Sequence, residues 1–208
     1  MAQILAVRSF HGIILAAEDH AVQLNERGEE VTLKVKRLLP LSSQSMLLAA
    51  GAPEGIDMAN SLKNFLQGEG LRDIQDLYGA TLAYLSSEYE QFMRKKCEFL
   101  PIDPILYVSF ILAGRTSRDE ERPFRLYYLW TKKKLPQLDG EEIANAFSLP
   151  RRMALEYQLN QLSKGAASLE DILTAAKAGI EKLRAQGEAK GPFSWAKITH
   201  DGSQALTV

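Results

Sequence analysis

The sequence has little from which a covalent or metal-linked framework could be built, since Cys97 is its only cysteine. A single thiol forms neither an intramolecular disulfide nor a multi-cysteine metal site. No two histidine or cysteine residues stand at the helical spacing typical of a metal site. We therefore predict no metal and no cofactor. A lone cysteine also suits a reducing compartment, and we expect a cytoplasmic protein.

Long apolar runs and an excess of one charge are absent too. No stretch of about 18 apolar residues is present to span a membrane, and the start of the chain has strand-like sequence instead of a signal peptide. The formal net charge is -1, and the basic segments 94–96, 132–134 and 151–152 are short and scattered. Such a charge distribution gives no broad attraction to phosphate or anionic lipid. We expect neither nucleic acid nor a membrane as a partner.

What the chain does contain is typical of a globular protein. Its 208 residues are 46% hydrophobic and 25% charged, which is enough for one domain with a buried core, and we predict a single domain over residues 1–208. Short apolar or alternating runs predict strands over 4–7, 12–17, 31–38, 44–50, 105–114, 125–130 and 193–199. Apolar residues spaced by three or four predict helices over 53–66, 71–96, 151–162 and from Ser168, where a capping box begins.

Blocks of strands thus alternate with pairs of helices along the chain. A parallel doubly wound sheet needs one crossover helix between successive strands, which this order does not provide. We therefore predict an α+β protein in which two stacked antiparallel sheets carry a helix pair on each outer face. The pattern of residues 140–149 is ambiguous.

Several segments resemble the subunits of proteasomes. GIILAAEDHAV is similar to the second strand of that family, and VKRLLPLSSQSMLLAAGAPEGIDMANSLKNFL to its next strand pair, glycine turn and first helix. ILYVSFILAG and KITHDG fall where the family has its central and final strands. The resemblance covers most of the chain, and it is to the β-type subunits and the bacterial ring protease, since the α-type helical extension is lacking. It implies the four-layer αββα sandwich of the N-terminal-nucleophile (Ntn) hydrolases.

The position of the family's nucleophile carries a different residue here. In that family a threonine hydroxyl at the start of the first strand attacks the peptide carbonyl, and the α-amine of the same residue is the base. Matching QILAV and GIILAAE to the family puts Ala2 at that position. Alanine has no oxygen with which to attack, so the resemblance implies that this nucleophile has been lost.

Supporting positions of the family site differ as well. The family's aspartate corresponds to Glu18, and its essential lysine, which lowers the pKa of the nucleophile, corresponds to Arg37 or, with the register shifted by one, to Lys36. Arginine keeps its proton near neutral pH, so we expect no proton-shuttling role for it.

The serine of the family's glycine-rich turn corresponds to Ser148, and the aspartate and serine near the chain end correspond to Gln186 and Ala189. Gly51 keeps the backbone N–H that the family uses for the oxyanion. The resemblance therefore implies a degenerate catalytic site.

These residues also have purely structural interpretations. Gly51 is equally well explained as a turn glycine with positive φ, and Glu18 and Arg37 as a residual salt bridge. Cys97 is interpreted as a structural residue. The three histidines are interpreted as solvated surface or turn residues: His11, His20 and His200.

Two classes of function remain open from the sequence. The one we favour is a proteasome-like subunit that has lost threonine-peptidase activity and acts as a self-associating scaffold or binding protein. The resemblance implies a homo-oligomer, with a ring as one form and the helix over 71–96 as the contact, and it leaves a peptide or small-molecule ligand open. The alternative is an active Ntn hydrolase, a threonine-type endopeptidase or another amidohydrolase, with a nucleophile not evident at the N-terminus.

Overall fold

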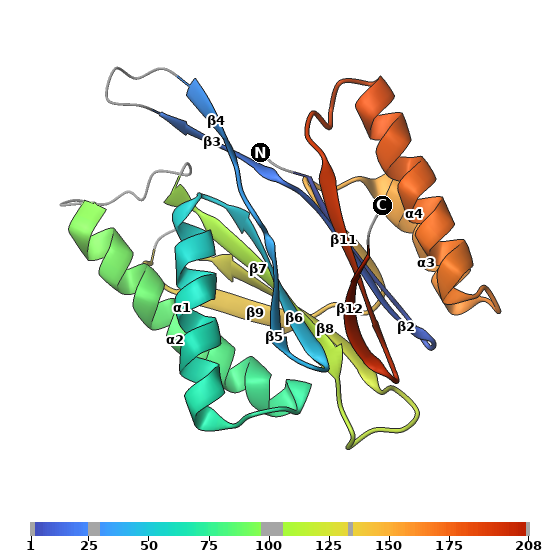
Figure 1. The fold of residues 1–208 in the computed structure, drawn as a ribbon, viewed down its shortest axis with the longest axis horizontal. Coiled ribbons are helices and arrows are strands. Elements are labelled where there is room, and N and C mark those ends of the chain that lie inside the picture. The colour runs from blue at the N-terminus through green and yellow to red at the C-terminus, as the bar shows by residue number, and fades with distance from the viewer. Residues whose placement is uncertain (1–2, 25–29, 97–105, 133–134, 207–208) are drawn as a thin grey trace.

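The computed structural model describes residues 3–24, 30–96, 106–132 and 135–206 of the chain (Figure 1). In these residues twelve strands lie in antiparallel sheets beside four helices, which confirms the α+β class. The helices are α1 (Glu54–Glu69), α2 (Ile74–Lys96), α3 (Met153–Lys164) and α4 (Leu169–Ala185).

Two five-stranded sheets and one separate hairpin contain all of these strands. The first sheet has the order β10-β1-β2-β11-β12, with β10 (Ala146–Leu149), β1 (Ile4–Ser9), β2 (Gly12–Glu18), β11 (Phe193–Thr199) and β12 (Gly202–Leu206). The second has the order β5-β6-β7-β8-β9, with β5 (Leu38–Ser42), β6 (Ser45–Gly51), β7 (Val108–Arg115), β8 (Phe124–Thr131) and β9 (Leu138–Glu142). The hairpin consists of β3 (His20–Leu24) and β4 (Glu30–Lys34).

Apolar side chains fill the space between the two sheets and the space between each sheet and its helices. Ile13 and Leu15 of β2 face the second sheet, where they pack in one cluster with Ile111. Ile14, between them in sequence, faces α4 and packs with Ile172. Because successive side chains of a strand point to opposite faces, a strand covered on both faces has a continuous apolar sequence, as β1 and β2 do. Each fully buried side chain of this size contributes about 1.5–3 kcal/mol.

The helices cover the outer faces of the two sheets in pairs (Figure 1). A cluster that includes Leu62 of α1 and Leu85 of α2 packs on the second sheet, and a cluster that includes Leu159 of α3 and Ile180 of α4 packs on the first. The predicted capping box at the start of α4 is confirmed, since the hydroxyl of Ser168 accepts from the N–H of Asp171 at 3.2 Å. The helices predicted over 53–66 and 71–96 correspond to α1 and α2.

The predicted strand over 31–38 is wrong, because the chain forms two separate strands there, β4 and β5. The connection between them contains Arg37, whose buried guanidinium bonds to main-chain carbonyls of two other segments. Residues 140–149, whose pattern is ambiguous, contain the end of β9 and all of β10. The sequence patterns also missed β3 and β12.

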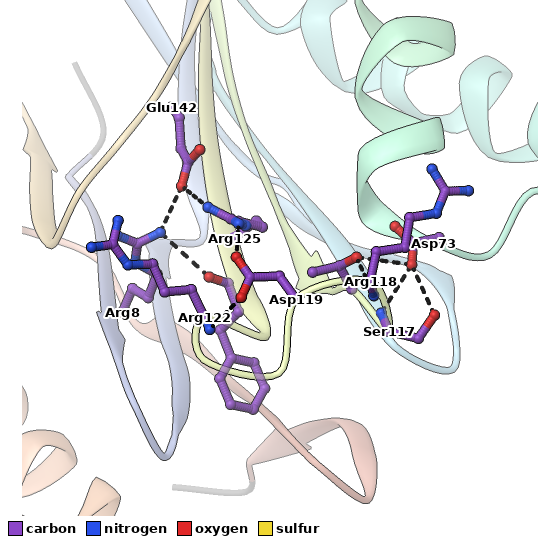
Figure 2. Close-up of polar contacts among 10 residues, drawn as sticks. Arg8, Asp73, Ser117, Arg118, Asp119, Arg122, Arg125 and Glu142 are labelled. Carbon is purple, nitrogen blue, oxygen red and sulfur yellow. Dashed lines mark hydrogen bonds and ion pairs between the residues drawn. The ribbon is translucent and has the colours of Figure 1, made fainter.

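Charged side chains link the two sheets at the end of β1 that carries Arg8 (Figure 2). One carboxylate oxygen of Glu142, on β9, accepts from Arg8 of β1 at 2.7 Å and from Arg125 of β8 at 2.8 Å. Arg125 also bonds to Asp119 in the β7–β8 loop at 2.6 Å. Asp73, before α2, accepts from the N–H and hydroxyl of Ser117 in the same loop.

Replacing Glu142 by alanine is expected to lower the free energy of unfolding by about 1 kcal/mol, because the carboxylate is 38% exposed and its ion pairs are partly screened by solvent. Urea unfolding followed by circular dichroism measures the difference. Glu120→Ala in the neighbouring loop, at an exposed residue, is the control and should unfold like the unmodified protein. Equal effects of the two substitutions would contradict the linking role of Glu142.

Candidate functional site

The predicted site residues gather at the end of the sheets where β1 begins and β2 ends. Glu18 is the last residue of β2, Gly51 the last residue of β6, and Arg37 directly precedes β5. Ser148 lies in β10, which pairs with β1. Ala2 lies outside the described residues, so its predicted place at the head of the first strand stays a prediction.

The carboxylate of Glu18 binds three backbone N–H groups. Its Oε2 accepts from Gln3 at 2.9 Å, and its Oε1 accepts from Lys190 at 2.5 Å and Gly191 at 2.7 Å. The residue is only 1% exposed. Burial alone would raise the pKa of Glu18, but these donors together hold the pKa below its ordinary value, so the carboxylate is ionised at neutral pH. Both of its oxygens are occupied by structural hydrogen bonds.

The length of the Glu18 side chain explains which segments it joins. Gln3 directly precedes β1, whereas Lys190 and Gly191 lie in the loop between α4 and β11. A carboxylate one methylene shorter, as in the aspartate of the resembled family, would reach less far from the same backbone position. Glu18 therefore connects the residue before β1 to the loop before β11 through hydrogen bonds.

The guanidinium of Arg37 is likewise occupied by the main chain. It is 1% exposed, and it donates to the carbonyl of His20 from Nη2 at 2.8 Å and to the carbonyl of Ala49 from Nη1 at 3.2 Å. Burial lowers the pKa of Arg37, while the negative charges of Glu18 and Asp19 raise it in part. Three carbonyl-directed bonds in all fix the guanidinium, the third being from Nε to His20 at 3.2 Å.

The predicted salt bridge between Glu18 and Arg37 is wrong. Among the described residues no ion pair joins these two side chains, because the first binds backbone N–H groups and the second binds backbone carbonyls. Lys36, the alternative position for the family's lysine, is exposed to solvent. The buried cation at this place is therefore an arginine used for structure.

Gly51 adopts the left-handed conformation that its interpretation as a turn glycine requires. Its φ is +84°, and a Cβ atom built on it would stand 2.2 Å from the carbonyl oxygen of Tyr107. That carbonyl accepts from the N–H of Ala52 at 2.9 Å, so it cannot move away without losing a hydrogen bond. Only glycine fits here, whatever its backbone N–H binds.

Replacing Gly51 by alanine is expected to lower the free energy of unfolding by about 2 kcal/mol or more, since the added Cβ brings both left-handed strain and a backbone clash. Gly79→Ala is a matched control: Gly79 lies in α2 with no atom within 4 Å of a built Cβ, and the substitution should stabilise the protein because alanine favours helix. Thermal unfolding of both variants checks the opposite signs. A destabilisation of Gly51→Ala below that of ordinary surface substitutions would contradict the geometry.

Ser148 holds the beginning of α3. Its hydroxyl donates to Oε1 of Glu156 at 2.6 Å and accepts from the N–H of Arg152 at 2.7 Å, and the residue is buried. Both capacities of this hydroxyl are used within the protein. Ser148 is thus placed as a structural residue, and Glu156, which the sequence patterns missed, is its main partner.

Glu156 is the centre of the polar cluster around Ser148. Its carboxylate accepts from the N–H and hydroxyl of Ser148, from the N–H of Arg152, and in bidentate fashion from the guanidinium of Arg151. Burial would raise the pKa of Glu156, but the hydrogen bonds from Arg151 and Ser148 lower it below the ordinary value. A glutamate at the fourth position of a helix carries no pattern that marks it as buried, so only the structure identifies it.

The two chain-end positions of the family site are also occupied structurally. Gln186 caps the C-terminus of α4 with its N–H bonded to the carbonyl of Lys182 at 3.1 Å. Ala189 is buried in the cluster between α4 and the first sheet.

The histidines divide into two groups. His11 and His200 are exposed and lie in turns, as predicted. The surface prediction for His20 is wrong: the residue begins β3, its side chain is mostly buried, and Nδ1 lies 3.4 Å from Oε1 of Glu18. Cys97 lies outside the described residues.

An open groove of about 710 Å³ lies beside Glu18. Three segments line it: residues 18–20, residues 32–34 of β4, and residues 188 and 190–192 of the loop before β11. Glu18, Arg37 and Ser148 are themselves buried, so neighbouring atoms fill the space directly around their charged or hydroxyl groups. The groove offers room for a ligand next to these residues, and its lining has mixed charge, with Lys34 and Lys190 beside Asp19 and Glu188.

The two lowered pKa values predict how stability changes with pH. The hydrogen bonds that Glu18 and Glu156 accept hold their pKa values in the folded protein below the ordinary value of a glutamate, so the unfolded chain takes up protons first as the pH falls. Their contribution is therefore complete above about pH 5 and is lost as the pH falls through the folded-state pKa values. Urea unfolding between about pH 7 and pH 3 should show this loss, and Glu156→Gln should show a shallower one. An unchanged slope in the variant would contradict the assignment.

No family model matches the chain, and a search of curated proteins finds no match. Within the described residues, no helix has the length and apolar character needed to cross a membrane, and no group of three or more histidine, cysteine, aspartate or glutamate residues is arranged to hold a metal ion.

Proposed function

We propose that the chain is a noncatalytic protein with the four-layer αββα architecture of the Ntn hydrolases, similar to a β-type proteasome subunit that has lost threonine-peptidase activity. Two kinds of observation support this. The segments quoted above resemble that family in order along the chain, and the helix pairs pack on the outer faces of two stacked antiparallel sheets. In this role the protein serves as a self-associating scaffold or binding protein of the cytoplasm.

The main-chain hydrogen bonds of Glu18 and Arg37 are the observation on which the proposed loss of activity rests. An Ntn hydrolase needs charged groups that can change their hydrogen bonds or protonation as the nucleophile reacts. Here the carboxylate binds three backbone N–H groups and the guanidinium binds two backbone carbonyls, so any movement toward a substrate would break structural hydrogen bonds. In addition, Ala2 has no side-chain oxygen that could attack a substrate.

Hydrolysis of fluorogenic peptides tests this loss. The purified protein should release fluorophore no faster than buffer. A rate above buffer that grows with protein concentration would favour the alternative, an active Ntn hydrolase with a nucleophile elsewhere in the chain.

Self-association is the second part of the proposal, with α2 as its contact surface. Small residues on the exposed side of α2 would allow another subunit to approach closely: Gly79, Ala83 and Ser87. Light scattering should give a mass well above the 23.2 kDa of one chain. Ala83→Arg should lower this mass, whereas Ala178→Arg, at an exposed residue of α4, should leave it unchanged. If the protein had the mass of one chain at micromolar concentration, the proposed role as a self-associating scaffold would be wrong.

A further inference from the structure

The β3–β4 hairpin extends away from the rest of the protein and has an unpaired edge (Figure 1). Strand β4 pairs with β3 on one side, and in the described part of the chain no strand pairs with its other side. The main-chain groups along such an edge are available to a further strand.

The ladder between β3 and β4 indicates which main-chain groups face outward. The N–H of Val35 donates to the carbonyl of Asp19 at 3.2 Å, in the register that pairs His20 with Lys34. Hydrogen-bonded and non-hydrogen-bonded pairs alternate in an antiparallel ladder, so the main-chain groups of Thr32 and Lys34 point away from β3. The carbonyl of His20, opposite Lys34, is consistent with this, since it points away from β4 and bonds to Arg37.

Strand β4 lacks two of the features that protect an edge strand from pairing. Such features include proline and bulges, and β5, another edge strand, has both, with Pro40 in the strand and an irregular register between Pro40 and Ser42. In β4 neither is present. Val31 and Leu33 stand on one face of β4 with 39% and 38% of their surface exposed. Both would lose exposed apolar area if another strand were added.

The sequence of β4 is complementary to itself. It reads Glu-Val-Thr-Leu-Lys, and when two copies run antiparallel about Thr32, Val31 of each lies opposite Leu33 of the other, and the acidic residue opposite Lys34. Opposite charges and apolar pairs across strands are both favourable. The register also matches the main chain, because it makes Thr32–Thr32 a hydrogen-bonded pair, and the groups of Thr32 already point outward.

We propose that two copies of this chain pair through the free edges of β4 about a twofold axis, forming one four-stranded sheet in the order β3-β4-β4-β3. This contact specifies one way in which the proposed self-association takes place. It rests on the proposed function only because it requires that copies of the chain associate. It lies on a different element from α2, so the two contacts can be tested separately.

A cysteine at the twofold axis tests the pairing directly. The Cα atoms of a hydrogen-bonded antiparallel pair are about 5.5 Å apart, which is within the range that a disulfide bridges. Thr32→Cys, in a chain whose Cys97 is replaced by serine, should shift under mild oxidation from the mass of one chain to that of a covalent dimer. Gln204→Cys, at an exposed residue of the edge strand β12, is the control and should stay at one chain. Equal cross-linking of the two variants would overturn the proposal.

Exchanging the charges at the two ends of β4 tests this contact separately from the contact through α2. Lys34→Glu puts like charges opposite each other and should lower the mass measured by light scattering, and the double variant Glu30→Lys/Lys34→Glu should restore it. An assembled protein whose mass neither variant changes would overturn pairing through β4 while leaving self-association intact. An unmodified protein that stays at 23.2 kDa would overturn self-association and this contact together.

Discussion

Replacing Glu156 by alanine is expected to lower the free energy of unfolding by about 3–4 kcal/mol. The residue is 3% exposed, and loss of its side chain leaves the N–H and hydroxyl of Ser148 without their acceptor in a buried place. Arg151 also loses its bidentate partner, although its own side chain is half-exposed and can be solvated. Each buried donor left unpaired costs about 1–3 kcal/mol, which dominates the sum.

Urea unfolding of purified variants measures this effect. Glu156→Gln keeps an acceptor oxygen at nearly the same place and should lose less than Glu156→Ala. Glu181→Ala, which removes an exposed glutamate paired with Arg184 on α4, should have little effect. If Glu156→Ala were no more damaging than Glu181→Ala, the cluster would not hold the start of α3 as described.

Replacing Glu18 by alanine is expected to cost about 3–4 kcal/mol of unfolding free energy, because three backbone N–H groups lose a charged acceptor at once. Glu18→Asp is the more informative change. The charge is kept, but a side chain one methylene shorter cannot span from Gln3 to Gly191, so we expect an intermediate loss of about 1–2 kcal/mol.

Thermal and urea unfolding of both variants provide the measurement, and Glu69→Ala at the exposed end of α1 is the control. Should Glu18→Ala fail to fold, Glu18→Asp still decides the matter. Full stability of Glu18→Asp would mean that the reach of the glutamate has no structural purpose, contrary to the role given to it here.

Regular patterns made much of the fold predictable. The apolar runs of β1 and β2, the spacing in α2 and the capping box at Ser168 each depend on neighbouring residues in the sequence, and the structure confirms them. The antiparallel α+β class followed from the order of these elements alone. Local periodicity is sufficient for such elements because the buried face is set within a few residues.

Features that depend on distant contacts could not be predicted in the same way. The alternating pattern over 31–38 runs from β4 into the first residue of β5, but between the two strands Arg37 binds the carbonyls of His20 and Ala49, which are distant in the sequence. The burial of Glu156 depends on Ser148, eight residues earlier on another element. The partial burial of His20 depends in part on Gly191, which lies next to its imidazole but is far away in the sequence.

Intact-mass measurement after treatment with an electrophile that needs a hydroxyl or thiol beside a free α-amine tests the loss of the nucleophile most directly. We predict that the mass of the protein stays unchanged, since Ala2, at the position matched to the family's nucleophile, offers neither a hydroxyl nor a thiol. One covalent label per chain, mapped to the first residue of the protein, would show a working nucleophile and contradict the account.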